Sequence, residues 1–112
     1  MNPMEKFVQH ILARLRMLEI NNCIDLKSTK LNRNILIEKC EVGFNVYENG
    51  VNTKTFKKVP FQELSPLLKV LIKMEFSADP KIKVSTLKSK DENPEEKTEA
   101  PASNDAEENS EE

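Results

Sequence analysis

Apolar side chains recur every three or four positions near the start of the chain, which predicts an amphipathic helix ending near Ile20. The repeat consists of Met4, Phe7, Val8, Ile11, Leu12, Leu15 and Leu18. Asn2 can cap this helix, Pro3 suits its first turn, and Glu5 can complete a capping box.

Residues 23–58 change to the period-two alternation of half-buried strands. The clearest run places Val42, Phe44 and Val46 between Gly43, Asn45 and Tyr47. The apolar phase shifts between residues 37 and 42, so we expect a bulge or a turn near residues 38–41. Asn49-Gly50 predicts a two-residue hairpin turn, because both residues accept positive φ, and residues 51–58 would return as the partner strand.

A second helical repeat covers residues 61–76, and Ser65-Pro66 would either start that helix late or kink it. Its apolar face consists of Leu64, Leu67, Leu68, Leu71 and Ile72. Beyond Asp79-Pro80, residues 81–87 alternate as an edge strand would. The predicted class is α+β: an N-terminal amphipathic helix, an antiparallel β-meander of three to four strands, and a second helix packed on the sheet. A meander followed by a helix resembles, in architecture only, the single-stranded nucleic-acid binders of the Pur-alpha type, and no residue role is transferred on that basis.

The end of the chain differs in composition from the rest. Alanine is the only apolar residue type in residues 91–112, so we expect a disordered acidic tail after a single α+β domain at residues 1–90. Residues 1–90 contain 16 Lys and Arg against 9 Asp and Glu, a formal charge of +7; residues 91–112 contain 10 acidic residues and only Lys97, a charge of −9. A basic body joined to an acidic tail is the most informative feature of this sequence.

The sequence contains few residues that could form a catalytic or metal-binding site. His10, the only histidine, falls on the polar side of the first helix, and Cys23 and Cys40 are too few for a zinc site. With only two glycines, a glycine-rich phosphate loop is also excluded. We therefore expect a protein that is not an enzyme and needs no metal or other cofactor. If the first hairpin turns between Leu31 and Asn32, the two cysteines should be cross-strand neighbours.

No apolar run approaches the length of a membrane span, and charged residues interrupt the N-terminal segment, which therefore lacks the pattern of a signal peptide, so we expect a cytoplasmic protein. The excess of positive charge favours nucleic acid as a partner. Tyr47 and Phe56 would share the polar face of the predicted hairpin and form a contact surface with its lysines. The candidate nucleic-acid-binding residues are Lys6, His10, Arg14, Arg16, Tyr47, Lys54, Phe56, Lys58, Lys69 and Lys73. Two alternatives remain: a protein–protein adaptor with a solubilising tail, and a chaperone-like homodimer.

Overall fold

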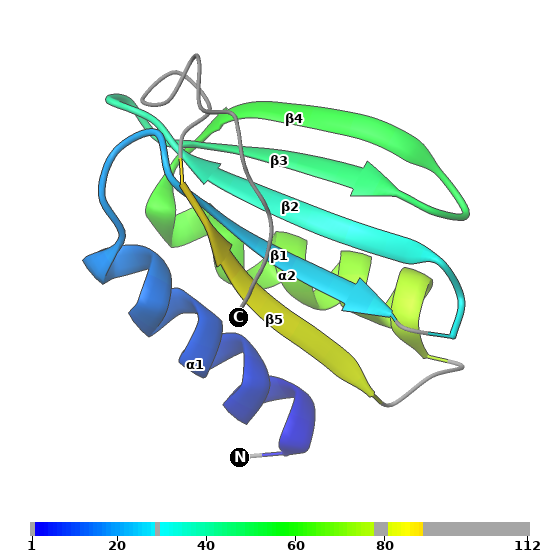
Figure 1. Ribbon diagram of the computed structural model, residues 1–112. Coiled ribbons are helices and arrows are strands. Elements are labelled where there is room, and N and C mark those ends of the chain that lie inside the picture. The colour runs from blue at the N-terminus through cyan, green and yellow to red at the C-terminus, as the bar shows by residue number, and fades with distance from the viewer. Residues whose placement is uncertain (1, 29, 78–80, 89–112) are drawn as a thin grey trace.

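The computed structural model describes residues 2–28, 30–77 and 81–88. In chain order the elements are α1 (Pro3–Met17), β1 (Cys23–Ser28), β2 (Arg33–Lys39), β3 (Phe44–Asn49), β4 (Thr53–Val59), α2 (Phe61–Phe76) and β5 (Ile82–Leu87). The strands form one antiparallel sheet in the order β4-β3-β2-β1-β5, and both helices cover the same face of it (Figure 1). This arrangement confirms the α+β prediction, with β5 as the expected edge strand. The predicted tail at residues 91–112 lies outside the described residues.

Helix α1 forms as the sequence predicts, although it ends earlier than expected. The Asn2 side chain accepts a hydrogen bond from the backbone N–H of Glu5 at 2.8 Å, and Pro3 is the first helical residue. These contacts satisfy a backbone donor that the helix start would otherwise leave free. The helix ends at Met17 rather than near Ile20, and Asn21 follows with a φ of 76°.

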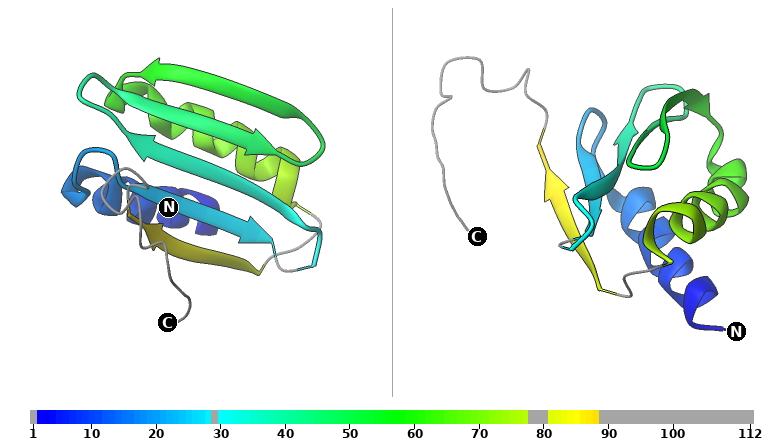
Figure 2. Two further views of the ribbon diagram at one scale, coloured as in Figure 1. Left: turned by 45° about the horizontal axis from the view of Figure 1, so that its top comes forward. Right: turned by 90° about the vertical axis from the view of Figure 1, so that its right-hand side faces the viewer.

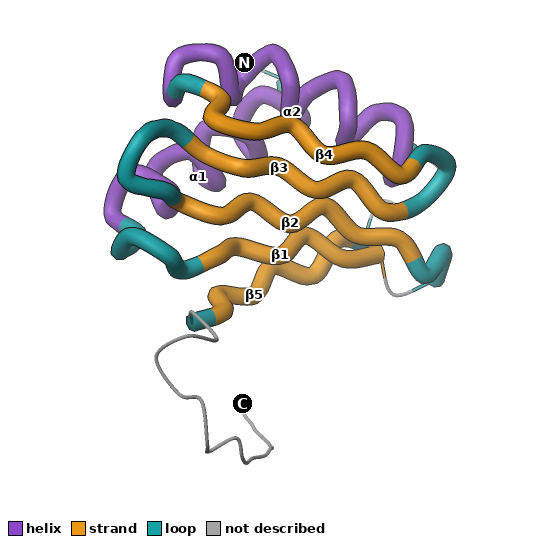
Figure 3. The backbone as a smooth tube through the Cα atoms, turned by 90° about the horizontal axis from the view of Figure 1, so that it is seen from above, coloured by secondary structure: helices purple, strands orange, loops and turns teal. Residues whose placement is uncertain are grey.

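The core lies between the helices and one face of the sheet (Figure 3). Alternate residues of three neighbouring strands supply the sheet side of it: Ile24, Leu26, Ile35, Ile37, Phe44 and Val46. The helices supply the other side with Val8, Ile11, Leu12, Leu15, Leu64, Leu68, Leu71, Ile72 and Phe76. Full burial of one such side chain is worth about 1.5–3 kcal/mol, so this layer is the main source of stability.

The register of the first hairpin differs from the prediction. Cys23 pairs with Glu38, so the expected pairing of the two cysteines is wrong by two residues. The turn sets this register: the Ser28 hydroxyl accepts the backbone N–H of Leu31 at 2.9 Å, and Asn32 has a φ of 54°. A shift of two residues leaves the same side chains facing the core, because side chains alternate along a strand. The hydrophobic pattern therefore cannot distinguish the two registers.

The second hairpin turn is one residue longer than predicted. Asn49 pairs with Thr53, so three residues rather than two form the loop. One extra residue reverses the face on which every following side chain lies. Phe56 therefore pairs with Val46 and packs against the core, whereas Tyr47 lies on the opposite face. The expectation that Tyr47 and Phe56 share a face is wrong.

A β-bulge in β4 then reverses the faces on which its side chains lie, while β4 stays paired with β3. The register shifts between Phe44 and Val46, and Lys58 has a φ of 55°. The backbone N–H of Lys58 donates to the Asn45 side chain at 3.0 Å. The turn expected near residues 38–41 lies between β2 and β3, where Cys40 N–H donates to the Gly43 carbonyl at 3.0 Å. The bulge brings Val59 back to the core side of the sheet.

Helix α2 begins at Phe61, and Pro66 lies inside it. A late start at Ser65 is therefore wrong, and the helix tolerates a proline that removes one backbone donor. Strand β5 follows and pairs with β1, which places Ile82 and Val84 against the core.

Candidate nucleic-acid interface

One face of the sheet is turned away from the helices (Figure 2), and we call it the open face. Its side chains form rows that cross the strands. The strand registers define three rows. The first row runs Lys83, Lys27, Asn34, Asn49 and Thr53; the middle row runs Ser85, Asp25, Leu36, Tyr47 and Thr55; the last row runs Leu87, Cys23, Glu38 and Asn45. These paired residues of the open face are mainly polar, and they combine amides, two carboxylates, two lysines and one phenol.

A hydrogen-bonded group holds Tyr47 on this face. Its hydroxyl donates to Glu38 Oε1 at 3.0 Å, and the Asn45 amide donates to the same oxygen at 3.2 Å. Burial and the bond to the Glu38 carboxylate both raise the pKa of the Tyr47 phenol. The phenol is therefore neutral, and its half-buried ring is fixed over the middle of the sheet.

Two lysines face each other directly at one end of the sheet. Lys27 of β1 pairs with Lys83 of β5, and both side chains are exposed. Neither has an ion-pair partner within the described part of the chain. Nearby, Asp25 accepts a hydrogen bond from the Asn34 amide at 2.9 Å. Like charges directly opposite on a sheet repel, so an anion placed between these ammonium groups would stabilise them.

The basic residues predicted from the sequence do not gather on one face. Those of the helices lie on the other side of the molecule: Lys6, His10, Arg14, Arg16, Lys69 and Lys73. Three of them already make contacts there. Arg16 stacks over the Phe61 ring at 4.6 Å, Lys69 lies 3.7 Å from Glu5, and Arg14 donates to the Thr86 hydroxyl at 2.6 Å. Lys54 and Lys58 are exposed on the edge strand β4, and of the two predicted rings only Tyr47 lies on the open face.

The open-face residues that the sequence analysis missed are Lys27 and Lys83. The sequence pattern that could have identified them is the alternation of residues 23–28 and 82–87, which puts both lysines on the side of the sheet opposite Leu26 and Val84. Alternation alone did not show that these two strands, far apart in the sequence, would be neighbours.

The cysteines and the histidine are not assembled into a reactive group. Burial and the nearby Glu38 carboxylate raise the pKa of the Cys40 thiol, which keeps it protonated and weakly nucleophilic. Neither Cys23 nor Cys40 forms a disulfide within the described part of the chain. Within residues 2–28, 30–77 and 81–88, no group of three or more His, Cys, Asp or Glu side chains could hold a metal ion. None of the described helices is long and apolar enough to cross a membrane.

A buried pair of carboxyl groups ties α2 to the β3–β4 turn. Glu48 and Glu75 are 1% and 0% exposed. Glu75 accepts the backbone N–H of Val51 at 2.7 Å and that of Asn52 at 3.3 Å, and Arg33 lies 4.0 Å away. Glu48 Oε2 has no hydrogen-bond partner among the described residues.

These two groups share one proton. Burial, followed by the hydrogen bond and the charge of Glu75, raises the pKa of Glu48 to about 7. Burial opposes ionisation of Glu75 as well, but hydrogen bonds from Glu48, Val51 and Asn52 outweigh it and lower the pKa of Glu75. Below neutral pH Glu48 therefore holds the proton and donates a hydrogen bond to the Glu75 carboxylate. Since both groups are buried, this pair is structural rather than a site open to a substrate.

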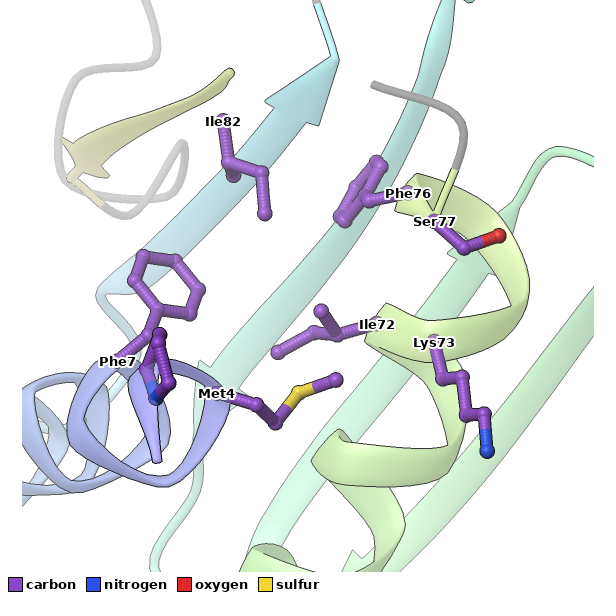
Figure 4. A pocket seen from close by; sticks show the side chains of 8 residues that line it. Met4, Phe7, Ile72, Lys73, Phe76, Ser77 and Ile82 are labelled. Atoms are coloured by element: carbon purple, nitrogen blue, oxygen red, sulfur yellow. The ribbon is translucent and has the colours of Figure 1, made fainter. Parts of the chain in front are cut away.

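A pocket of about 430 Å³ opens where the start of α1, the end of α2 and the start of β5 meet. Met4, Phe7, Ile72, Phe76 and Ile82 face a common space, while the Lys73 side chain extends away from it (Figure 4). The lining could hold a small apolar group, because ligand pockets are commonly apolar and of about 300–1,000 Å³.

Comparisons of the chain with family models, with curated proteins and with solved structures find no match.

Proposed function

We propose that the protein is a non-enzymatic nucleic-acid-binding protein whose affinity is mainly electrostatic and is weakened by its own acidic segment, residues 91–112. The observation that carries this proposal is the division of charge. Residues 1–90 carry +7 and residues 91–112 carry −9. Lysines that bind phosphates release counterions from the nucleic acid, which is the main sequence-independent source of affinity.

The acidic segment would act as a competitor that is attached to the chain. An attached anionic segment has a high effective concentration near the basic surface, and it needs no specific contact to screen that surface. Weak binding would be suppressed, whereas a ligand that makes additional contacts would still displace the segment.

The proposal is tested with a neutralised-tail variant, which is the full chain with the ten acidic residues of 91–112 replaced by Asn or Gln. The net charge then changes from −2 to +8. We expect this variant to bind oligonucleotides more tightly than the natural chain at low salt, with a gain that decreases as salt rises. A chain in which residues 91–112 are shuffled but keep their composition is the control, and it should bind like the natural chain. If the neutralised-tail variant binds neither single-stranded nor duplex oligonucleotides at low salt, the proposal is wrong.

A protein–protein adaptor is the second candidate, and the apolar pocket favours it. An apolar side chain of a partner could enter the space between Phe7, Ile72 and Ile82. Binding driven by such burial depends weakly on salt, in contrast to binding of phosphates. Measuring binding over a range of salt concentrations therefore distinguishes the two candidate functions.

A further inference from the structure

We propose that the nucleic acid is single-stranded and lies across the open face, with its phosphates along the first row and a base stacked on Tyr47. This inference rests on the proposed nucleic-acid function and gives it a site and a ligand class. The site differs from the basic residues of the two helices, which lie on the other side of the sheet (Figure 2).

The lysine pair provides the first argument. Lys27 and Lys83 lie directly opposite each other, where like charges destabilise a sheet. Neither lysine has an anionic partner among the described residues. A phosphate bound between the two ammonium groups would remove the repulsion and gain two charge-assisted contacts. The first row continues through the amides of Asn34 and Asn49, so none of its residues is acidic, and the Asp25 carboxylate beside it accepts the Asn34 amide at 2.9 Å.

The carboxylates of the open face lie in the other two rows and are occupied. Asp25 accepts the amide of Asn34, and Glu38 accepts both Tyr47 and Asn45. A nucleic-acid backbone that runs along the first row therefore places its phosphates beside the lysines, and its bases are directed towards the middle row. There the bases meet the Tyr47 ring and the apolar side chain of Leu36, which pair directly. Bases stack on aromatic rings whatever their sequence, and amide side chains can bond to their exposed edges.

The size of the open face favours a narrow ligand over a second copy of this chain. Five strands spaced about 4.8 Å apart and about 20 Å long present an area on the order of 400 Å². A stable protein interface needs about 800 Å² on each partner, roughly twice that area. A single strand of nucleic acid is narrow, and small single-strand-binding domains contact as few as about 4 nucleotides. A duplex hides its bases inside the helix, where a flat sheet cannot reach them.

The sequence offers a direct test, because Tyr47 is the only tyrosine and the chain has no tryptophan. Tyrosine fluorescence therefore reports on one position of the open face. Titration of the full chain at low salt with oligothymidylate of about 10 nucleotides should quench this fluorescence in a saturable way. A duplex of the same length should bind more weakly and quench less.

Matched variants locate the site. Affinity for a nucleic acid falls as salt rises, and the steepness is the slope of log K against log salt concentration, here called the salt slope. We expect Lys27→Gln with Lys83→Gln to make this slope smaller by about 1.4, which corresponds to two phosphates on a single strand. Tyr47→Leu should weaken binding about 5- to 150-fold, the loss of one stacked base. The control is Lys6→Gln with Lys73→Gln, which removes the same charge from the helical side and should leave most of the slope. Circular dichroism and thermal unfolding confirm that each variant is folded.

Each result has one interpretation. If the oligonucleotide binds but only the helical-side pair weakens it, or if the fluorescence of Tyr47 does not change, the open-face site is wrong and the nucleic-acid function stands. If duplex and single strand bind equally through the same residues, the ligand class is wrong. If even the neutralised-tail variant binds nothing, the proposed function itself fails.

Discussion

Replacing Glu48 with glutamine should make the protein more stable above neutral pH. Folding raises the pKa of Glu48 from 4.5 to about 7. The folded protein thus keeps this proton over a pH range in which the unfolded chain has lost it. The stabilisation that comes from protonated Glu48 is complete below pH 4.5, falls between pH 4.5 and about pH 7, and is absent above that. Glutamine imitates the protonated acid at every pH, because its amide donates to Glu75 and cannot ionise.

The magnitude follows from the size of the shift. A change from 4.5 to about 7 corresponds to a free energy of about 3 kcal/mol at most, since one pKa unit is worth 1.36 kcal/mol. We expect Glu48→Gln to match the natural protein within about 1 kcal/mol at pH 5 and to exceed it by about 2–3 kcal/mol at pH 8. Glu75 does not disturb this comparison, because its lowered pKa affects stability only at more acidic pH.

Urea unfolding followed by circular dichroism at pH 5, 6, 7 and 8 measures the difference. The control is Glu41→Gln, at an exposed carboxylate in the β2–β3 turn, which should show no pH-dependent gain. If the free energy of unfolding of Glu48→Gln runs parallel to that of the natural protein from pH 5 to pH 8, the two carboxyl groups do not share a proton and the reasoning is refuted.

Three further predictions concern stability and cysteine chemistry. Gly50→Ala should lower the free energy of unfolding by about 1–3 kcal/mol, measured in urea, because a Cβ atom at Gly50 would collide with the Glu75 carboxylate; an unchanged value would contradict this packing. Mild oxidation should not join Cys23 to Cys40 within one chain, because Cys23 pairs with Glu38, and mass spectrometry that finds this disulfide in the folded protein would contradict the register. Truncation after Lys90 should change the thermal midpoint by less than about 2 °C, a shift that corresponds to well under 1 kcal/mol, whereas a chain that no longer folds would show that residues 91–112 belong to the domain.

The sequence predicts which side chains are buried better than it predicts which residues are paired. Alternation identifies Phe44 and Val46 as core residues, because burial inside a strand follows the phase of the pattern. Val42 has the same phase but precedes the strand, and it is 70% exposed. Pairing depends on the turns, and the errors at Cys40 and Phe56 come from a turn position and a loop length that the hydrophobic pattern does not encode. The phase also continues to Glu48, but nothing in the sequence shows that a carboxyl group there would remain buried.

The site was less predictable than the fold for a related reason. Charge counting finds lysines, and it does not tell which of them will face each other after the chain has folded. Lys27 and Lys83 become neighbours only because β5 pairs with β1. The basic residues chosen from the sequence were those of the most regular elements, and the structure spreads them over the helices and an edge strand.

The pairing of β5 with β1 also determines the order in which the chain can fold. The strands β1 to β4 follow one another through short turns, so their ladders form between residues that are close in sequence. The pairing of β1 with β5, which includes Cys23 with Leu87, instead closes a loop that contains the rest of the sheet and α2. Closing such a long loop has a larger entropic cost than closing a short turn. We therefore expect β5 to join last, both in refolding and during synthesis. Until Ile82–Leu87 is in place, β1 is an unpaired edge next to Ile24 and Leu26, so a chain that is arrested before β5 should aggregate through that edge.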